Sequence, residues 1–367
     1  MGSSKLSHPY RGLPSYHFWS SSVSQTPGAE LDPVIHPRFT IGRDEKVAAA
    51  GSCFAQHIAR YIRRDGFRFL ETEEPLAPGS STVSARFGNI YTVRQLHQLL
   101  LRAYGLLRPV GRAWLREDGK FIDPFRPQIF AEGFASREDV EQSRIQHLKA
   151  VRQMFEQCDI FLFTLGLTEC WLSSDGIAYP VPPGVVAIET EEGDYRFHNL
   201  TVSEMHNDLL GFLGDFRDIN PTGRIILTVS PVPIVATYED RHVLVSNTYS
   251  KSALRVVAEE GRRACGFVEY FPGYEIVTAP SLGFGYFEAD LRSVSEVGLE
   301  HVMRVFSRHF LSDSPADKSQ AKLPTSGTSE KLATNLSPER EAELLASAAA
   351  LHDSLCDEEL LDQAGDI

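Results

Sequence analysis

Four short apolar runs occur along the chain, each bounded by glycine, proline or charged residues. They cover residues 46–50, 159–166, 224–230 and 267–271. Most positions within them are apolar, which is typical of strands that are buried on both faces of a parallel sheet. These four runs are therefore predicted to be the strands of one sheet.

Helical patterns lie between these runs. Helices are predicted to start at residues 54, 92, 136, 201, 247 or 248, and 294. Thr201 and Glu204 fit a capping box, in which two side chains satisfy free backbone amides. Turn residues and alternation in 172–198 indicate an inserted hairpin. Because strands alternate with helices, the pattern predicts an α/β domain whose parallel sheet has helices on both faces.

Changes in composition divide the chain into four parts. Residues 1–43 are predicted to be an N-terminal arm that lies on the domain, and residues 44–311 the α/β domain itself. Residues 312–336 are rich in Ser, Thr, Lys, Pro and Ala, which predicts a flexible linker. Residues 337–367 are predicted to form an acidic amphipathic helix, which either docks on its own domain or binds a protein partner.

Composition and charge exclude some function classes. The chain has 367 residues, of which 42% are hydrophobic and 23% charged, as in ordinary globular proteins. The formal net charge is −13, and the segment from Ser312 onward, with 12 acidic and 4 basic residues, carries −8 of it. Nucleic-acid binding is not expected, because phosphates require a basic face.

The five cysteines include no CxxC pair and are odd in number. This usage favours reduced thiols in a cytoplasmic protein and gives no metal-binding spacing. The first thirty residues lack the apolar core of a signal peptide, and no apolar run approaches the roughly 18 residues of a membrane span. We therefore expect no metal, no cofactor and no membrane span.

Small and polar residues follow three of the predicted strands, at 51–53, 166–169 and 230–233. In parallel sheets the ligand site lies at the carboxyl ends of the strands, so these segments predict a site. Cys53 begins a helix there, and free amides and the helix dipole favour a thiolate or an oxyanion. Ser52 is the rival nucleophile. Alternatively, Cys53 is a small buried filler and Ser52 a helix cap.

The run Gly51-Ser52-Cys53-Phe54-Ala55 resembles the signature of the GSCFA family, relatives of the SGNH (GDSL-type) hydrolases. Further motifs resemble that family at 87–91, 164–169, 227–233 and 250–255, and at 270–275. The resemblance covers about residues 40–310. It implies a flavodoxin-like, three-layer α/β/α sandwich with a parallel sheet of about five strands.

The resemblance also implies site residues. In SGNH enzymes a serine after the first strand attacks an ester, and a glycine amide and an asparagine side chain help to hold the oxyanion. Cys53 takes the nucleophile position, and Gly88 with Asn89 beside it takes the glycine position. Gly166 begins the block that normally holds the asparagine, but Thr168 stands in its place.

The usual Asp-x-x-His pair falls on Asp290 and Ser293, so the histidine is missing. Serine is not a useful base near neutral pH, whereas a cysteine nucleophile needs less help. His57, one helical turn after Cys53, is an alternative base or a surface histidine. Asp290 can still orient a base or bind a substrate hydroxyl.

Other polar residues near the predicted strand ends are candidates for substrate binding. Glu169 either does this or pairs with an arginine, and Ser230 lies at the third strand end. Lys251 and Arg255 are spaced i,i+4 and either hold an anionic group or form a solvated face. Arg86 and Arg292 are further candidates for such an anion site.

Two functions remain open. The first is an SGNH-like ester hydrolase or O-acyltransferase that acts through Cys53 on an acyl ester or thioester, with a saccharide or another small hydroxylated molecule as acceptor. The second is a catalytically degenerate relative that binds an acylated or glycan ligand. The missing histidine favours the second, and the retained cysteine and glycines favour the first.

Overall fold

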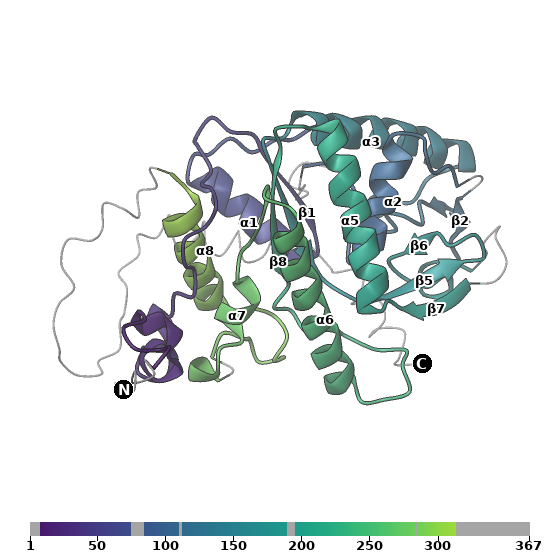
Figure 1. Ribbon diagram of the computed structural model, residues 1–367. Helices are drawn as coiled ribbons and strands as arrows, with labels where there is room; N and C mark the ends of the chain where they lie inside the picture. Colours follow the sequence, from purple (N-terminus) through teal and green to yellow (C-terminus); the bar gives the residue numbers. More distant parts are fainter. Residues whose placement is uncertain (1–7, 75–83, 110–111, 189–194, 284, 313–367) are drawn as a thin grey trace, which may run out of the picture.

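The computed structural model describes residues 8–74, 84–109, 112–188, 195–283 and 285–312 (Figure 1). The predicted linker from residue 313 onward and the predicted C-terminal helix lie outside the described residues. The same holds for the side chain of Cys53, whose backbone is placed.

All four apolar runs form strands of one parallel sheet, as predicted. The strands are β1 (Val47–Gly51), β4 (Ile160–Leu165), β8 (Arg224–Val229) and β9 (Val268–Tyr270), in the order β1-β4-β8-β9. Every residue of β1 and β4 is buried. Continuous apolar character predicts such strands because both of their faces lie against other side chains.

The predicted fifth strand is reduced to a single parallel bridge. Phe69 pairs with Val47 at the free edge of β1. The Val47 amide donates to the Arg68 carbonyl at 2.9 Å, and the Leu70 amide donates to the Val47 carbonyl at 2.8 Å. The central sheet of the described residues therefore has four named strands and one extra bridge.

Helices cover both faces of the central sheet, as predicted. Figure 1 shows α1 (Cys53–Arg64) and α8 (Glu296–Phe310) on one side of β1 and β8, and α5 (Val202–Ile219) and α6 (Val243–Ala264) on the other. The second layer also contains α2 (Val93–Ala103), which contacts α5, and α3 (Arg137–Gln157), which contacts α2. The short helix α7 (Gly273–Val277) contacts α8.

Local capping sets the helix starts. The predicted capping box of Thr201 and Glu204 is present at the start of α5. The predicted start of α6 at residue 247 or 248 was wrong, because the helix begins at Val243. The Nδ1 atom of His242 caps it by accepting a hydrogen bond from the Leu244 amide at 3.1 Å.

Two small antiparallel sheets flank the main one. The segment predicted as a hairpin contributes to a three-stranded sheet, in the order β6-β5-β7, and to the short helix α4. The second small sheet pairs β2 with β3. The bounds are β2 (Trp114–Leu115), β3 (Phe121–Ile122), β5 (Glu169–Ser173), β6 (Ala178–Tyr179), α4 (Pro183–Val186) and β7 (Tyr195–Asn199).

The N-terminal arm lies beside α8 (Figure 1). Its helical turns are η1 (Ser15–His17), η2 (Ser20–Ser24) and η3 (Gly28–Glu30), and the turn η4 (Pro280–Leu282) contacts η3. His301 of α8 contacts the arm through Nε2, which lies 2.8 Å from the Leu31 carbonyl oxygen.

Candidate active site

The turn between β1 and α1 requires glycine at its first position. Gly51 has φ +136°, and a Cβ atom there would lie only 2.4 Å from the carbonyl oxygen of Thr164. The two strand ends approach closely because the Ser52 amide donates to that same oxygen at 3.3 Å. The glycine of the motif is thus explained by backbone geometry.

Ser52 and Cys53 follow at the start of α1. Ser52 occupies the N-cap position, yet its side chain makes no capping hydrogen bond. It is 4% exposed, and its hydroxyl has no partner among the described residues. Cys53 is the first helical residue, so its backbone lies where amides are free and the helix dipole is positive.

The loop that carries Gly88 and Asn89 ties the ends of β1 and β4 together. The Ile90 amide donates to the Gly51 carbonyl at 2.9 Å, and the Gly166 amide donates to the Tyr91 carbonyl at 3.0 Å. Gly88 adopts φ +65° and Asn89 is buried. Gly88 and Asn89 therefore lie two positions and one position before the residue that contacts the Gly51 turn.

Gly166 packs directly on the turn. A Cβ atom at Gly166 would lie 3.3 Å from Ser52 Cβ and 3.2 Å from Tyr91 Cδ1. Buried hydroxyls usually have a partner in protein, water or ligand, so this end of the sheet suits a polar ligand. Buried hydroxyls without a partner among the described residues occur at or beside these strand ends: Ser52, Thr164, Thr168, Thr228 and Ser250.

Lys251 is a buried amine at this site. It is 1% exposed, and its Nζ donates to the Gly166 carbonyl at 2.8 Å. Arg255, one turn later on α6, instead pairs with Glu275 at 2.8 Å and Glu259 at 3.1 Å. The structure therefore places Lys251 at the strand ends, whereas the charge of Arg255 is already matched by carboxylates.

Glu169 and Ser230 shape the loop that follows β8. Glu169 accepts hydrogen bonds from the Thr237 hydroxyl at 2.6 Å and from the Tyr238 amide at 3.2 Å. Burial raises the pKa of its carboxyl group. Ser230 is buried and accepts from the Val232 amide at 3.3 Å. Glu169 has no arginine partner among the described ion pairs.

Asp290 and Ser293 bond to each other on the surface. The Ser293 hydroxyl donates to Asp290 at 2.6 Å, and the amides of Arg292 and Ser293 each donate at 2.9 Å. Partial burial raises the pKa of Asp290, but these hydrogen bonds outweigh it and the net shift is downward. Arg292 Nε reaches the Pro233 carbonyl at 3.1 Å, so this segment borders the loop after β8.

Neither His57 nor His301 has the properties of a general base for the nucleophile. Burial and the nearby Arg60 lower the pKa of His57 to about 3, whereas an effective general base titrates near the working pH. His301 uses both ring nitrogens, at 2.7 Å from the Tyr286 hydroxyl and 2.8 Å from the Leu31 carbonyl. No described histidine bonds to the Ser52 hydroxyl.

Lys251 is buried, whereas its spacing from Arg255 had suggested an anion site or a solvated face. Its spacing from Leu254 and Ala258, both buried, places it on the inner stripe of α6. That apolar periodicity was visible in the sequence and would have separated Lys251 from its partner in the proposed anion site, Arg255.

The model of the GSCFA family matches residues 46–306. The chain belongs to the GSCFA family. The match begins at the start of β1 and ends within α8, so it spans the whole central sheet of this GSCFA protein. No curated protein matches the chain.

Three solved structures are distant likenesses of this GSCFA protein. A carbohydrate esterase of family 3 from Talaromyces cellulolyticus is 13% identical, with TM-score 0.32 and coverage of 72% of this chain and 95% of that one. A putative GDSL-like lipase from Parabacteroides merdae is 15% identical, with TM-score 0.32 and coverage of 74% and 98%. The salicylyl-acyltransferase SsfX3 of a tetracycline biosynthetic pathway is 16% identical, with TM-score 0.26 and coverage of 44% and 40%.

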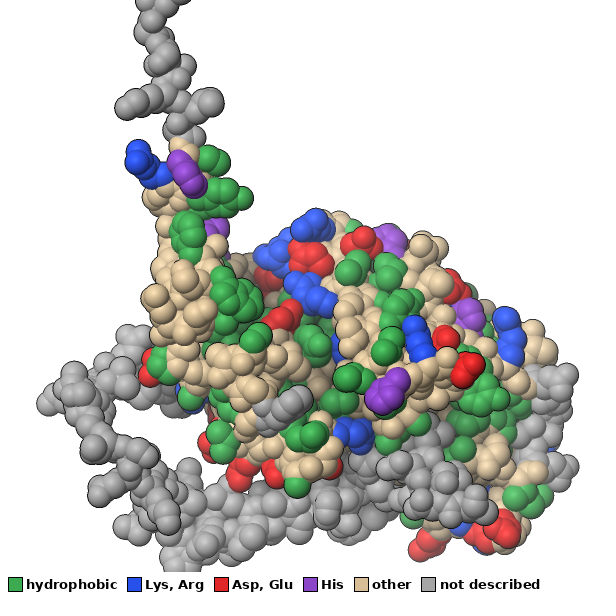
Figure 2. Space-filling view, turned by 90° about the horizontal axis from the view of Figure 1, so that it is seen from below, with side chains coloured by type: hydrophobic (Ala, Val, Ile, Leu, Met, Phe, Trp, Pro, Cys, Tyr) green, Lys and Arg blue, Asp and Glu red, His purple; other side chains and the backbone are tan. Residues whose placement is uncertain are grey.

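Apolar side chains are exposed on two loops and on the first turn of α6 near the site. Tyr238, Leu244 and Leu291 are 69%, 65% and 54% exposed. Figure 2, seen from below relative to Figure 1, shows hydrophobic side chains interspersed with charged ones and histidine. In the part of the chain that the structure describes, no helix is long and apolar enough to cross a membrane, and no three His, Cys, Asp or Glu side chains form a metal site.

Proposed function

We propose that this GSCFA protein is an SGNH-like ester hydrolase or acyltransferase whose nucleophile is Cys53. The observation that carries the proposal is the meeting of the Gly51 turn, Gly166 and the buried amine of Lys251 at one end of the parallel sheet. Ligand sites of such sheets lie at this end.

The chemistry follows from the local groups. The Cys53 sulfur attacks the carbonyl carbon of an ester or thioester, the alcohol or thiol leaves with a proton, and an acyl-cysteine thioester remains. Water or a hydroxylated acceptor then takes the acyl group. The free amides of α1, the Gly88 amide and the Asn89 side chain are the candidate donors to the oxyanion of the tetrahedral intermediate.

Lys251 replaces part of the role of the missing histidine. A positive charge near a thiol favours its thiolate, and lysine partners a nucleophile in some hydrolases. The amine lies 2.8 Å from the Gly166 carbonyl, and Gly166 packs against Ser52, the residue before Cys53. Asp290 is exposed and accepts a hydrogen bond from the Ser293 hydroxyl, so the proposal gives the role of charge partner to Lys251 instead.

The acceptor is proposed to be a saccharide or another small hydroxylated molecule. Trp171, Phe197 and Tyr238 form an aromatic cluster, with ring centroids 5.0–5.9 Å apart. Tyr238 belongs to the loop after β8, whose carboxyl end borders the site. Its exposed ring offers an apolar face with a polar tip.

An acyl adduct on Cys53 is the expected result of incubation with short-chain p-nitrophenyl esters or acyl thioesters. Intact mass spectrometry should show one acyl group in the wild type and in Ser52→Ala, and none in Cys53→Ala. Burial raises the pKa of Cys158 and of Cys170 to about 12, so these thiols serve as unreactive internal controls. The experiment is best run in a Cys356→Ser background, because Cys356 lies outside the described residues.

An adduct that persists in Cys53→Ala would contradict the assignment. No adduct and no turnover with any acyl donor would instead support the degenerate ligand-binding alternative.

The free thiols Cys158, Cys170 and Cys265 are compatible with work in a reducing compartment such as the cytoplasm, where Cys53 stays reduced.

Replacing Lys251 with methionine should raise the pH at which Cys53 is alkylated at half its maximal rate. A neighbouring positive charge lowers a thiol pKa by roughly 1–3 units, so the expected rise is about 1 unit or more. Arg255→Gln is the matched control on α6, because its charge is engaged by two glutamates. If folded Lys251→Met protein shows the same pH dependence of Cys53 alkylation as the wild type, Lys251 does not act on the Cys53 thiol.

A further inference from the structure

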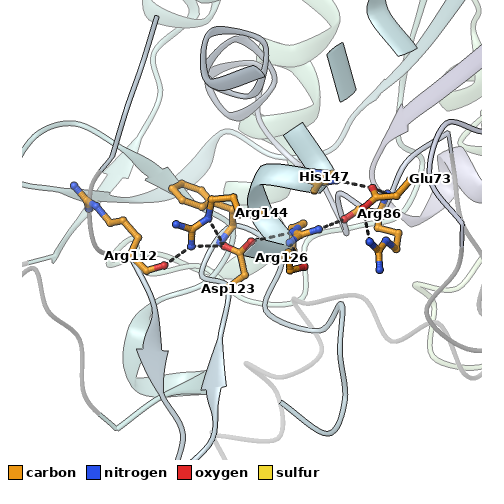
Figure 3. A network of polar contacts seen from close by, with 9 residues as sticks. Glu73, Arg86, Arg112, Asp123, Arg126, Arg144 and His147 are labelled. Atoms are coloured by element: carbon orange, nitrogen blue, oxygen red, sulfur yellow. Dashed lines mark hydrogen bonds and ion pairs between the residues drawn. The ribbon is translucent and has the colours of Figure 1, made fainter. Parts of the chain in front are cut away.

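A buried ionic network lies between the small sheets and α3. Asp123 has a fully buried side chain and accepts from Arg126 Nε at 2.9 Å and Arg144 Nη2 at 3.0 Å. Figure 3 shows the network running from Arg112 through these residues toward Glu73 and its partners. At that end, Glu73 binds His147 Nδ1 at 2.7 Å and Arg86 at 2.6 Å.

Among the described residues of this region, guanidinium groups outnumber carboxylates. There, the three carboxylates of Glu73, Asp123 and Asp175 face five guanidinium groups. Burial and Arg126 lower the pKa of His147 to about 4, so it adds no charge near neutral pH. A buried surplus of positive charge is costly unless an anion matches it. The five arginines are Arg86, Arg102, Arg112, Arg126 and Arg144.

Arg102 is the member whose charge has no carboxylate partner among the described residues. It lies in the last turn of α2, and its guanidinium carbon is 3.7 Å from the centre of the Phe125 ring. Its buried Nε has no hydrogen-bond partner in the described part of the chain. His147 is 2% exposed, and its Nε2 also lacks a partner there.

Arg102 and His147 line the same cavity. Asn89, Ile90 and Arg126 also line it, and its volume of about 20 Å³ exceeds the roughly 10–15 Å³ that one water molecule needs. The cavity adjoins the candidate active site, because the Ile90 amide donates to the Gly51 carbonyl at 2.9 Å. Two buried nitrogen atoms without a partner among the described residues thus face one small space near the Gly51 turn. The remaining lining residues are Phe87, Gln95, Gln98, Leu99, Phe125, Ala178 and Pro180.

We propose that this cavity binds a carboxylate group of the substrate, held between Arg102 and His147. The proposal rests on the proposed function and names its substrate class as an acyl ester that carries a free carboxylate, such as the half-ester of a dicarboxylic acid. The guanidinium group of Arg102 donates to the carboxylate.

Binding of the carboxylate takes up one proton from solvent. His147 Nδ1 faces Glu73, so the neutral ring presents a lone pair at Nε2, and only the protonated ring donates to an anion there. The charged groups near His147 are Glu73, Arg126 and Asp123. A bound carboxylate adds a negative charge and favours the imidazolium, so affinity should be higher at pH 6 than at pH 8.

The test needs no turnover. Hydrogen methyl succinate should raise the unfolding temperature of the full chain by roughly 2 °C or more at saturation, and more at pH 6 than at pH 8. The neutral dimethyl succinate should not. The shift should vanish in Arg102→Met, persist in part in Arg102→Lys, and remain in Arg152→Met, whose arginine is exposed on α3.

Equal shifts with the neutral diester, an undiminished shift in Arg102→Met, or no shift in the wild type would overturn the proposal. A kinetic arm separates this outcome from failure of the proposed function. Arg102→Met should raise the KM for p-nitrophenyl hydrogen succinate roughly ten- to a hundredfold and leave that for p-nitrophenyl butyrate unchanged. If Arg102→Met leaves the KM unchanged for both esters while Cys53 still reacts, the cavity proposal fails and the proposed function stands.

If neither ester acylates Cys53 while the anion still stabilises the protein through Arg102, the proposed function fails and the carboxylate site stands.

Discussion

Gly51→Ala is expected to lower the free energy of unfolding by about 3–5 kcal/mol, from backbone strain and overpacking together. Gly51 has φ +136°, and the new Cβ would lie 2.4 Å from the carbonyl oxygen and 2.7 Å from the amide nitrogen of Thr164. Both contacts are with backbone, so no side chain can rotate away. Strands β1 and β4 must separate, and they are joined along all of β1.

Urea unfolding followed by circular dichroism measures this loss. Gly119→Ala is the matched control, because Gly119 has φ +77° but no atom within 4 Å of the new Cβ. Gly119→Ala should lower the free energy of unfolding by only about 1 kcal/mol, because the positive φ is its only unfavourable feature. If the two variants lose the same stability, the close approach of the strand ends is not what requires glycine at the motif.

Asp123→Asn is expected to destabilise the protein by about 3–5 kcal/mol, because it leaves buried guanidinium groups without their carboxylate. The side chain is fully buried and bonds both Arg126 and Arg144. Asparagine keeps the shape and one acceptor, but its amide nitrogen would face a guanidinium donor, so the loss combines the charge with a hydrogen bond. Asp118→Asn is the control: this carboxylate, between β2 and β3, is 45% exposed and pairs with the partly exposed Arg116 and the Lys120 amide, so the change should have little effect.

The effect of Asp123→Asn should depend on pH with a definite sign. Burial raises the pKa of Asp123, but Arg144 and Arg126 lower it far more, so the folded-state value lies well below the usual range. A depressed pKa contributes stability above the unfolded value of about 4, and this stability is lost as pH falls. The difference in free energy of unfolding between wild type and Asp123→Asn should therefore be constant from about pH 5 to 8 and become smaller below about pH 4. A difference that grows in acid would contradict the assignment of a charged Asp123.

Much of the fold was predictable because its signals are local. Continuous apolar runs predicted β1, β4, β8 and β9, and the capping box of Thr201 predicted the start of α5. The start of α6 was missed because histidine at the cap and three apolar residues in the first turn give no polar start signal. In the part of the chain that the structure describes, the fifth strand implied by the resemblance is reduced to a pairing of one residue, Phe69, which no periodicity reveals.

The candidate site was predictable in its location but not in its partners. The residues after β1 and β4 meet because parallel strands end at one edge. The pairing of Lys251 with Gly166 joins residues 85 positions apart, and that of His147 with Glu73 joins residues 74 positions apart. His57 was a reasonable candidate by helix spacing, yet its low pKa arises from burial that spacing does not encode.

The sequence alone determined the family, the order of strands and helices along the chain, and the turn at Gly51, because these depend on neighbouring residues and on hydrophobic periodicity. Only the tertiary structure decided that Lys251 is buried at the strand ends. It also decided that Arg102 and His147 share one cavity beside them. Burial and charge are properties of segments that meet after folding, so the chemistry of the site depends on contacts that no local pattern records.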